Sequence, residues 1–168
     1  VGTSLAVTIA DTLTNNAAGN YTLTQPTGLR ADITPKALTV SGTTVANKIY
    51  NGNATATISN GTLVGVVDGD NVSLNQVATF SQSDVGIALV ITAANTLSNN
   101  TAGNYTLVQP TGLTADITPK ALTVSGAAVA NKVYDGSSVA TFTAGTLTGK
   151  VGSDDVTLTQ VGNFSQAN

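Results

Sequence analysis

The sequence predicts an all-β protein made of tandem small antiparallel β-sandwich domains, Ig-like in outline and joined into a rod. Two observations carry this prediction. Short segments rich in Thr and Val alternate apolar and polar residues, and turn signals containing Gly, Asn, Asp or Pro separate them. A long unit is also repeated in tandem. An extended β-grasp-like sheet is the alternative, because pattern alone does not give strand order.

A tandem repeat spans the chain. The segment ITPKALTVSG begins at Ile33 and again at Ile117, and 117 − 33 = 84, which is the period. The same shift places NYTLTQPTGLRAD at Asn20 onto NYTLVQPTGLTAD at Asn104. Two periods fill the 168 residues, so we expect the chain to be a window of a longer covalent array with neighbours on both sides.

The sequence places the domain boundaries at two Thr-Pro pairs, Thr34-Pro35 and Thr118-Pro119. Proline fixes its own φ and holds the preceding residue extended, so we expect a stiff junction between successive domains. The predicted parts are the C-terminal part of one repeat at residues 1–34, a complete repeat at 35–118, and the N-terminal part of the next repeat at 119–168.

Within the complete repeat, six segments have the alternation of strands. Their β-branched residues suit a pleated surface, and Thr supplies a polar face without charge. The expected strands are ALTVS at 37–41, ATATIS at 54–59, VSLNQV at 72–77, IALVITA at 87–93, NYTLVQ at 104–109 and ADIT at 115–118. The turn signals between them are Asn51-Gly52, Asn60-Gly61, and residues 68–71, 99–104 and 110–112.

Composition argues against catalysis and against several kinds of partner. The chain has no His, Cys, Met or Trp, and all nine acidic residues are Asp, so the groups that most often do chemistry at neutral pH are missing. We therefore expect no enzyme activity and no cofactor. A net charge of −3 with six basic residues does not favour nucleic acid, and no apolar run is long enough for membrane insertion.

One short motif stands out at a turn. Residues 132–136 read KVYDG, followed by Asp154, Asp155, Val156 and Phe164. The other copy carries GNYTL at 103–107 and ADITPK at 115–120, and it has Asn-Gly in place of Asp-Gly, which serves the same turn. This order resembles the YDG-type repeat, related to MBG domains, of large filamentous-haemagglutinin-like bacterial surface adhesins. The motif residues are Lys48, Tyr50, Asn51, Gly52, Lys132, Tyr134, Asp135 and Gly136.

The resemblance implies tandem stalk or filament modules on the outside of the cell, and it brings no catalytic residues. For the motif itself we favour a structural role, in which the Tyr ring packs at the core edge and its hydroxyl meets water. An isopeptide crosslink from Lys36, Lys48 or their copies Lys120 and Lys132 to an Asn or Asp, with an Asp as the proton-shuttling acid, is a less favoured hypothesis, because all three groups must be buried together.

The acidic loops are candidates for a metal site. Asp68, Asp70 and Asn71 offer oxygen ligands to Ca²⁺, but the equivalent residues are Gly152, Asp154 and Asp155. The set thus changes between copies, and it lacks the EF-hand spacing and its bidentate Glu. We favour the interpretation without a metal.

Three functions remain open at the level of sequence. The first is a structural stalk or filament of a secreted bacterial surface adhesin, whose partners are adjacent copies of the repeat. The second is a multivalent module in which each repeat binds a glycan or a host or matrix protein. The third is a fibre subunit that polymerises by strand complementation. All three place the protein outside the cell or on the bacterial surface.

Overall fold

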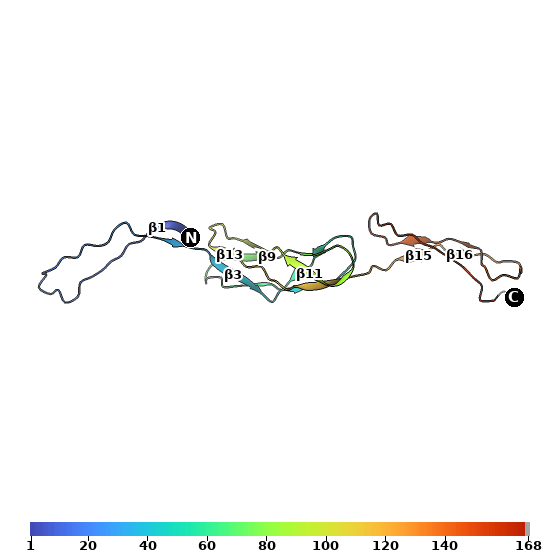
Figure 1. The fold of residues 1–168 in the computed structure, drawn as a ribbon, viewed down its shortest axis with the longest axis horizontal. Coiled ribbons are helices and arrows are strands. Elements are labelled where there is room, and N and C mark those ends of the chain that lie inside the picture. Colours follow the sequence, from blue (N-terminus) through green and yellow to red (C-terminus); the bar gives the residue numbers. More distant parts are fainter. Residues whose placement is uncertain (167–168) are drawn as a thin grey trace. The chain divides into compact units, whose positions relative to one another are not determined.

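The protein is all-β, as the sequence predicted. The computed structural model describes residues 1–166, and within that range it contains eighteen β-strands and no helix (Figure 1). Most strands are two to six residues long, and they are rich in Thr and Val. None of residues 1–166 lies in a helix long and apolar enough to span a membrane.

The chain forms two compact units. Unit 1 contains Val1–Val45, Thr57–Ala78 and Thr92–Leu113, and unit 2 contains Ala46–Ala56, Thr79–Ile91 and the residues from Thr114 onward. Each unit contains part of residues 35–118, so this division does not test the predicted repeat boundaries at Pro35 and Pro119.

Unit 1 has four small sheets. β3 is central to the largest, with β13 parallel on one side and β8 antiparallel on the other. The other pairs, β1–β2, β4–β7 and β9–β12, are antiparallel. The strands are β1 Gly2–Ala6, β2 Arg30–Ile33, β3 Lys36–Ser41, β4 Thr44–Val45, β7 Ile58–Ser59, β8 Thr62–Val64, β9 Ser73–Asn75, β12 Thr96–Ser98 and β13 Tyr105–Leu107.

Unit 2 is organised around a five-stranded sheet of order β5-β14-β11-β10-β6. β14 pairs antiparallel with β11 and parallel with β5, while β15–β18 and β16–β17 are separate antiparallel pairs. The strands are β5 Lys48–Ile49, β6 Thr55–Ala56, β10 Ala78–Phe80, β11 Gly86–Ala93, β14 Thr114–Thr118, β15 Thr123–Ser125, β16 Ala128–Val129, β17 Phe142–Thr143 and β18 Thr146–Thr148.

The prediction of purely antiparallel sheets is wrong for two pairs. β3 and β13 run parallel, as do β5 and β14, and in each case a long stretch of chain separates the paired strands. Parallel strands need a long crossover connection, and here the intervening strands supply it. Alternation along a strand indicates which face is buried but carries no information about strand direction.

The period of the sequence is present in the hydrogen-bond register itself. β1–β2 pairs Gly2 with Ile33, and β11–β14 pairs Gly86 with Ile117, after the same interruption of the ladder in both. At that bulge Ser4 and Ala88 have φ of 53° and 50°, an unusual value for residues with a side chain. The backbone N–H of each donates to an Asp carboxylate of the facing strand, Ser4 to Asp32 (2.7 Å) and Ala88 to Asp116 (2.8 Å).

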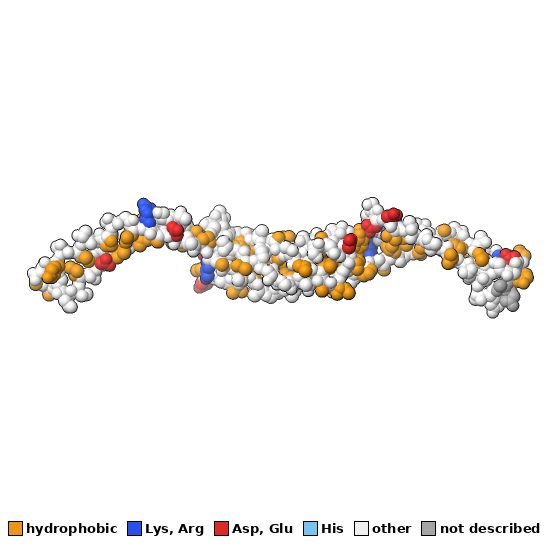
Figure 2. Space-filling view, in the orientation of Figure 1, with side chains coloured by type: hydrophobic (Ala, Val, Ile, Leu, Met, Phe, Trp, Pro, Cys, Tyr) orange, Lys and Arg blue, Asp and Glu red, His pale blue; other side chains and the backbone are white. Residues whose placement is uncertain are grey.

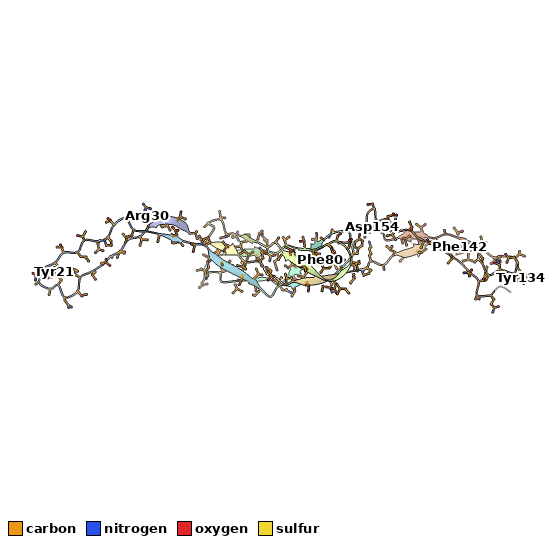
Figure 3. All side chains as sticks on the ribbon, viewed as in Figure 1. Tyr21, Arg30, Phe80, Tyr134, Phe142 and Asp154 are labelled. Atoms are coloured by element: carbon orange, nitrogen blue, oxygen red, sulfur yellow. The ribbon has the colours of Figure 1, made fainter. Side chains whose placement is uncertain are left out.

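The hydrophobic core is concentrated in residues 35–118. Leu38 and Ile117 are the largest fully buried side chains, and Phe80 lies among the ribbons of the sheet in Figure 3. The face drawn in Figure 2 carries hydrophobic side chains along its length and few charged groups. The buried apolar residues are Leu38, Ala78, Ala93 and Tyr105 in unit 1, and Ala56, Phe80, Ile91, Ala115, Ile117 and Ala140 in unit 2.

Equivalent leucines provide a test of this core. Leu38 is 0% exposed, whereas Leu122, the same position one repeat later, is only partly buried. We expect Leu38→Ala to lower the free energy of unfolding by about 2–5 kcal/mol, because it leaves a cavity. Leu122→Ala should cost clearly less. Urea unfolding followed by circular dichroism measures both, and equal losses would contradict the placement of the core.

Candidate functional site

The most elaborate polar site in unit 1 joins Tyr105 to the loop at residues 67–71. Tyr105 begins β13 and is 5% exposed. Its hydroxyl donates a hydrogen bond to the Asp70 carboxylate and accepts one from the Val67 backbone N–H (3.1 Å). The loop turns at Gly69, whose φ of 89° favours glycine. One aromatic side chain therefore holds this loop against β13.

The Tyr105 backbone is held as well. Its N–H donates to Asn100 Oδ1 (3.1 Å), and Asn100 Nδ2 donates to the Tyr105 carbonyl (2.8 Å). The hydrogen bond to Asp70, and secondly burial, raise the pKa of Tyr105 above its ordinary value. At neutral pH the phenol is therefore protonated and serves as a hydrogen-bond donor.

Each unit has a pocket beside a Thr-Pro pair, and the two pockets use equivalent residues. The cavity volumes are about 300 Å³ in unit 1 and about 170 Å³ in unit 2. Thr34 lines the first and Pro119 the second. Four positions are shared after a shift of one repeat, namely Val1, Lys36, Val67 and Asp70 in unit 1 and Val85, Lys120, Val151 and Asp154 in unit 2.

Tyr50 adds a second tyrosine–aspartate contact in the unit 2 pocket. Its hydroxyl faces the Asp154 carboxylate, which raises the pKa of Tyr50 by accepting its hydrogen bond. Nearby, the Val151 side chain lies so close to Gly52 that a Cβ at Gly52 would come within 3.0 Å of it. The loop that binds Tyr105 in unit 1 thus has a counterpart at residues 151–155 that contacts Tyr50 in unit 2.

In the first copy of the motif, where residues 48–52 read KIYNG, the Lys48 side chain folds back over the turn that follows it. Lys48 Nζ donates to the carbonyls of Asn53 (2.7 Å) and Thr55 (3.1 Å) and lies 5.6 Å from the centre of the Phe80 ring. Its contact with Asn53 Oδ1 (3.0 Å) has no counterpart in the second copy, where Ser137 takes that position.

The second copy of the motif is more exposed. Lys132 Nζ bonds to the carbonyls of Ser137 (2.9 Å) and Val139 (3.0 Å) and forms an ion pair with Asp135 (2.7 Å). Hydrogen bonding to Lys132 lowers the pKa of Asp135. Both turns have a glycine with positive φ, 79° at Gly52 and 76° at Gly136. Tyr134 is 75% exposed, so its ring does not pack at a core edge, unlike the partly buried Tyr50.

Two of the candidate metal ligands, Asp70 and Asp154, interact with tyrosine hydroxyls. Asp70 accepts the hydrogen bond of Tyr105, and Asp154 faces Tyr50. Asp70 and Asn71 also line a polar cavity of about 90 Å³. Across residues 1–166, no three residues of the His, Cys, Asp or Glu type come together in a way that could hold a metal ion, and Asp68, Asp155 and their neighbours do not form such a group.

Thr118 is held firmly on the N-terminal side of its proline. It pairs with Ile49, its hydroxyl donates to the Lys48 carbonyl (3.3 Å), and its own carbonyl accepts the Tyr50 N–H (2.8 Å). Strand pairing and hydrogen bonds therefore hold the backbone up to Thr118, the residue that precedes Pro119. Lys36, directly after Pro35, is likewise held by its N–H, which donates to the Asn104 carbonyl (2.9 Å).

Comparison with known families decides the classification. A family model described as the YDG domain matches residues 34–112 and again 118–168, and the two matches begin at equivalent positions of successive repeats, Thr34 and Thr118. The chain belongs to the YDG domain family. No curated protein and no solved structure matches the chain.

Sequence reasoning about this YDG chain missed two residues that organise the site. Tyr105 lies in the segment NYTL, outside the motif that draws attention to Tyr50 and Tyr134. Asn95 is 4% exposed, and its Oδ1 accepts a hydrogen bond from the Val77 N–H (3.0 Å). Its backbone N–H donates to the Gln109 side-chain oxygen, and its carbonyl accepts from the Gln109 side-chain nitrogen. The sequence does contain one indication of this role, because a Gln directly precedes a Pro in both copies. In the first copy the Gln25 side chain makes the same two hydrogen bonds to the backbone of Asp11.

The raised pKa of Tyr105 leads to a prediction for alkaline pH. The folded state holds the phenol proton more tightly than the unfolded state does. This contribution to stability is fully present below the unfolded pKa of about 10 and is lost as pH rises through the folded pKa. We expect Tyr105→Phe to reduce the fall of unfolding free energy above pH ~10, leaving the part that Tyr50 contributes.

Tyr21→Phe is the matched control, since Tyr21 is 75% exposed. Urea titrations at a series of pH values measure the slope for each variant. An unchanged slope in Tyr105→Phe would show that its contact with Asp70 does not stabilise the fold.

Proposed function

We propose that this chain is a section of a tandem structural repeat that forms the stalk or filament of a bacterial surface adhesin outside the cell. In this proposal the repeat carries out no catalysis, and its partners are adjacent copies of itself. Each repeat is a small Ig-like β-sandwich, and successive repeats are arranged as a rod.

The observation that carries the proposal is the repetition of strand register with the period of the sequence. β3–β8 pairs Thr39 with Val64, and β15–β18 pairs Thr123 with Thr148, so each partner is displaced by one repeat. A repeat that rebuilds the same ladder in each copy is typical of extended arrays, in which length is obtained by adding units. Membership in the YDG domain family is consistent with this role.

The Thr-Pro junction supports a mechanical role. Thr118 is fixed by its pairing with Ile49 and by hydrogen bonds to Lys48 and Tyr50, and the next residue has its φ fixed by the proline ring. Little rotational freedom is left between the end of β14 and the residues that follow. Such a connection transmits orientation from one repeat to the next, as a stalk requires.

An array of several repeats joined at this junction tests the proposal. We expect solution scattering to show a stiff particle whose greatest dimension grows in proportion to the number of repeats. Pro119→Gly at every junction should make the array more flexible without changing its circular dichroism, because glycine releases φ.

Pro110→Gly, in a loop within the repeat, is the matched control and should leave the scattering unchanged. A wild-type array that scatters as a flexible coil would overturn the stalk. Equal flexibility in the Pro119 variant and the wild type would show that the proline does not set the stiffness.

A further inference from the structure

One boundary between consecutive repeats, at Pro119, lies within unit 2. On its N-terminal side β14 ends at Thr118 and pairs with β5, and this pair joins the two halves of the complete repeat, residues 35–84 and 85–118. Tyr50 directly follows β5, and its backbone N–H donates to the Thr118 carbonyl (2.8 Å). The motif turn therefore lies beside the point where the chain leaves one repeat and enters the next.

The motif turn meets a loop of the following repeat at two places. The Tyr50 side chain and the Asp154 side chain line one cavity, together with Pro119, and both side chains are partly buried. Further along the turn, a Cβ placed on Gly52 would lie 3.0 Å from Val151 Cγ1. Successive repeats are thus in contact through side chains, and not only through the backbone at Pro119.

The contact between Tyr50 and Asp154 has the chemistry of a hydrogen bond to a charged acceptor. The Asp154 carboxylate raises the pKa of Tyr50 by accepting its hydrogen bond, and burial and the negative charge of Asp84 act in the same direction. The phenol is therefore protonated at neutral pH and donates to the carboxylate. Hydrogen bonds with an ionised partner are shorter and stronger than neutral ones, and they fix direction as well as distance.

The equivalent loop in the complete repeat, residues 67–71, shows that one loop Asp can serve two tyrosines. Tyr105 of the same repeat donates to Asp70 Oδ2, which is one of the two carboxylate oxygens. A carboxylate accepts hydrogen bonds through both oxygens. In an array, each loop Asp would therefore bind the NYTL tyrosine of its own repeat and the motif tyrosine of the preceding repeat.

We propose that the tyrosine and the glycine of the motif fix the orientation of one repeat on the next, and that their partner is the loop at residues 151–155 of the following repeat. Tyr50 supplies a directional hydrogen bond to Asp154. Gly52 supplies the turn and leaves room for Val151. This inference rests on the proposed tandem array, and it assigns part of the stiffness to a side-chain contact in addition to Pro119.

The second copy of the motif separates two demands on the glycine. Gly136 has φ of 76°, so the turn alone favours glycine there, and a Cβ placed on it meets no atom of residues 1–166 within 4 Å. Gly52 has φ of 79° and also the close approach of Val151. The same substitution at Gly52 and Gly136 therefore isolates the contact with the following loop from the strain of the turn.

A pair of cysteines measures the contact directly, because the chain has no cysteine of its own. In a polypeptide of residues 1–168, Gly52→Cys with Val151→Cys brings the two Cβ atoms within about 4.5 Å, inside the range that a disulfide spans. Equilibration with glutathione gives the effective concentration of one thiol at the other. We expect it to exceed that of Gly136→Cys with Val151→Cys, a control pair with the same turn strain, by at least about tenfold.

Tyr50→Phe and Asp154→Ala test which side chains hold the contact. Combined with Gly52→Cys and Val151→Cys, each should lower the effective concentration by about tenfold, as expected for the loss of a hydrogen bond to a charged group. The two changes together should lower it no further than either alone, because they remove the same bond. Tyr134→Phe is the matched control, since this equivalent tyrosine is 75% exposed, and it should have no effect.

A second measurement leaves the motif glycine in place. Spin labels attached through Ile87→Cys in β11 and Val129→Cys in β16 report the distance between the two repeats by pulsed electron paramagnetic resonance, and both positions are exposed. We expect a single narrow distance distribution in the labelled protein. It should broaden with Tyr50→Phe and with Gly52→Ala, and it should stay narrow with Gly136→Ala.

Failure of this inference is distinguishable from failure of the stalk. A Gly52–Val151 cysteine pair that crosslinks no better than its control would overturn the docking of the motif on the loop. Tyr50→Phe that changes neither the effective concentration nor the distance distribution would overturn it as well. Pro119 is unchanged in every one of these variants, so an array that scatters as a stiff particle would still support the stalk. An array that scatters as a flexible coil, with the cysteine pair crosslinked, would overturn the stalk and retain the contact.

Discussion

The structure depends on backbone pairing between the two halves of the repeat. β3 lies parallel to β13, although Lys36 and Tyr105 are far apart in the sequence, and β5 lies parallel to β14 across a similar separation. Backbone N–H and C=O groups that leave water must find partners, and these pairs supply them beside the fully buried Leu38 and Ile117. The hydrophobic core around Leu38 and Ile117 and the strand pairs between the two halves therefore form together or not at all.

The polar contacts follow from this constraint. Tyr105 reaches the loop at residues 67–71 only because β13 is already held against β3. Asn47 accepts the Asp116 N–H (2.8 Å) only because β14 lies beside the segment that leads into β5. In residues 1–34, which have no long-range strand partner among residues 35–166, the local bulge contact from Ser4 to Asp32 is present but Tyr21 is exposed. The local contact therefore does not require the pairs that bury Tyr105.

The all-β class and the period could be predicted from the sequence, because both are properties of local pattern. Alternation at 87–93 and 115–118 correctly marked β11 and β14. Strand direction could not be predicted in the same way, since it depends on which distant segments pair. The buried role of Tyr105 was also hidden, because the identical NYTL in both copies gives an exposed Tyr21 and a buried Tyr105. Context, and not residue type, decides between them.

Amide hydrogen exchange on a polypeptide of residues 1–168 tests the central claim most directly, because equivalent positions occur both within residues 35–118 and in the segments that flank them. The backbone N–H groups of Lys36, Tyr50 and Val108 are among those that bond between residues 35–84 and 85–118, and their counterparts one period away are Lys120, Tyr134 and Thr24. The account predicts exchange slower by orders of magnitude in the first set than in the second. Equal protection in the two sets would show that each half folds without the other and would contradict it.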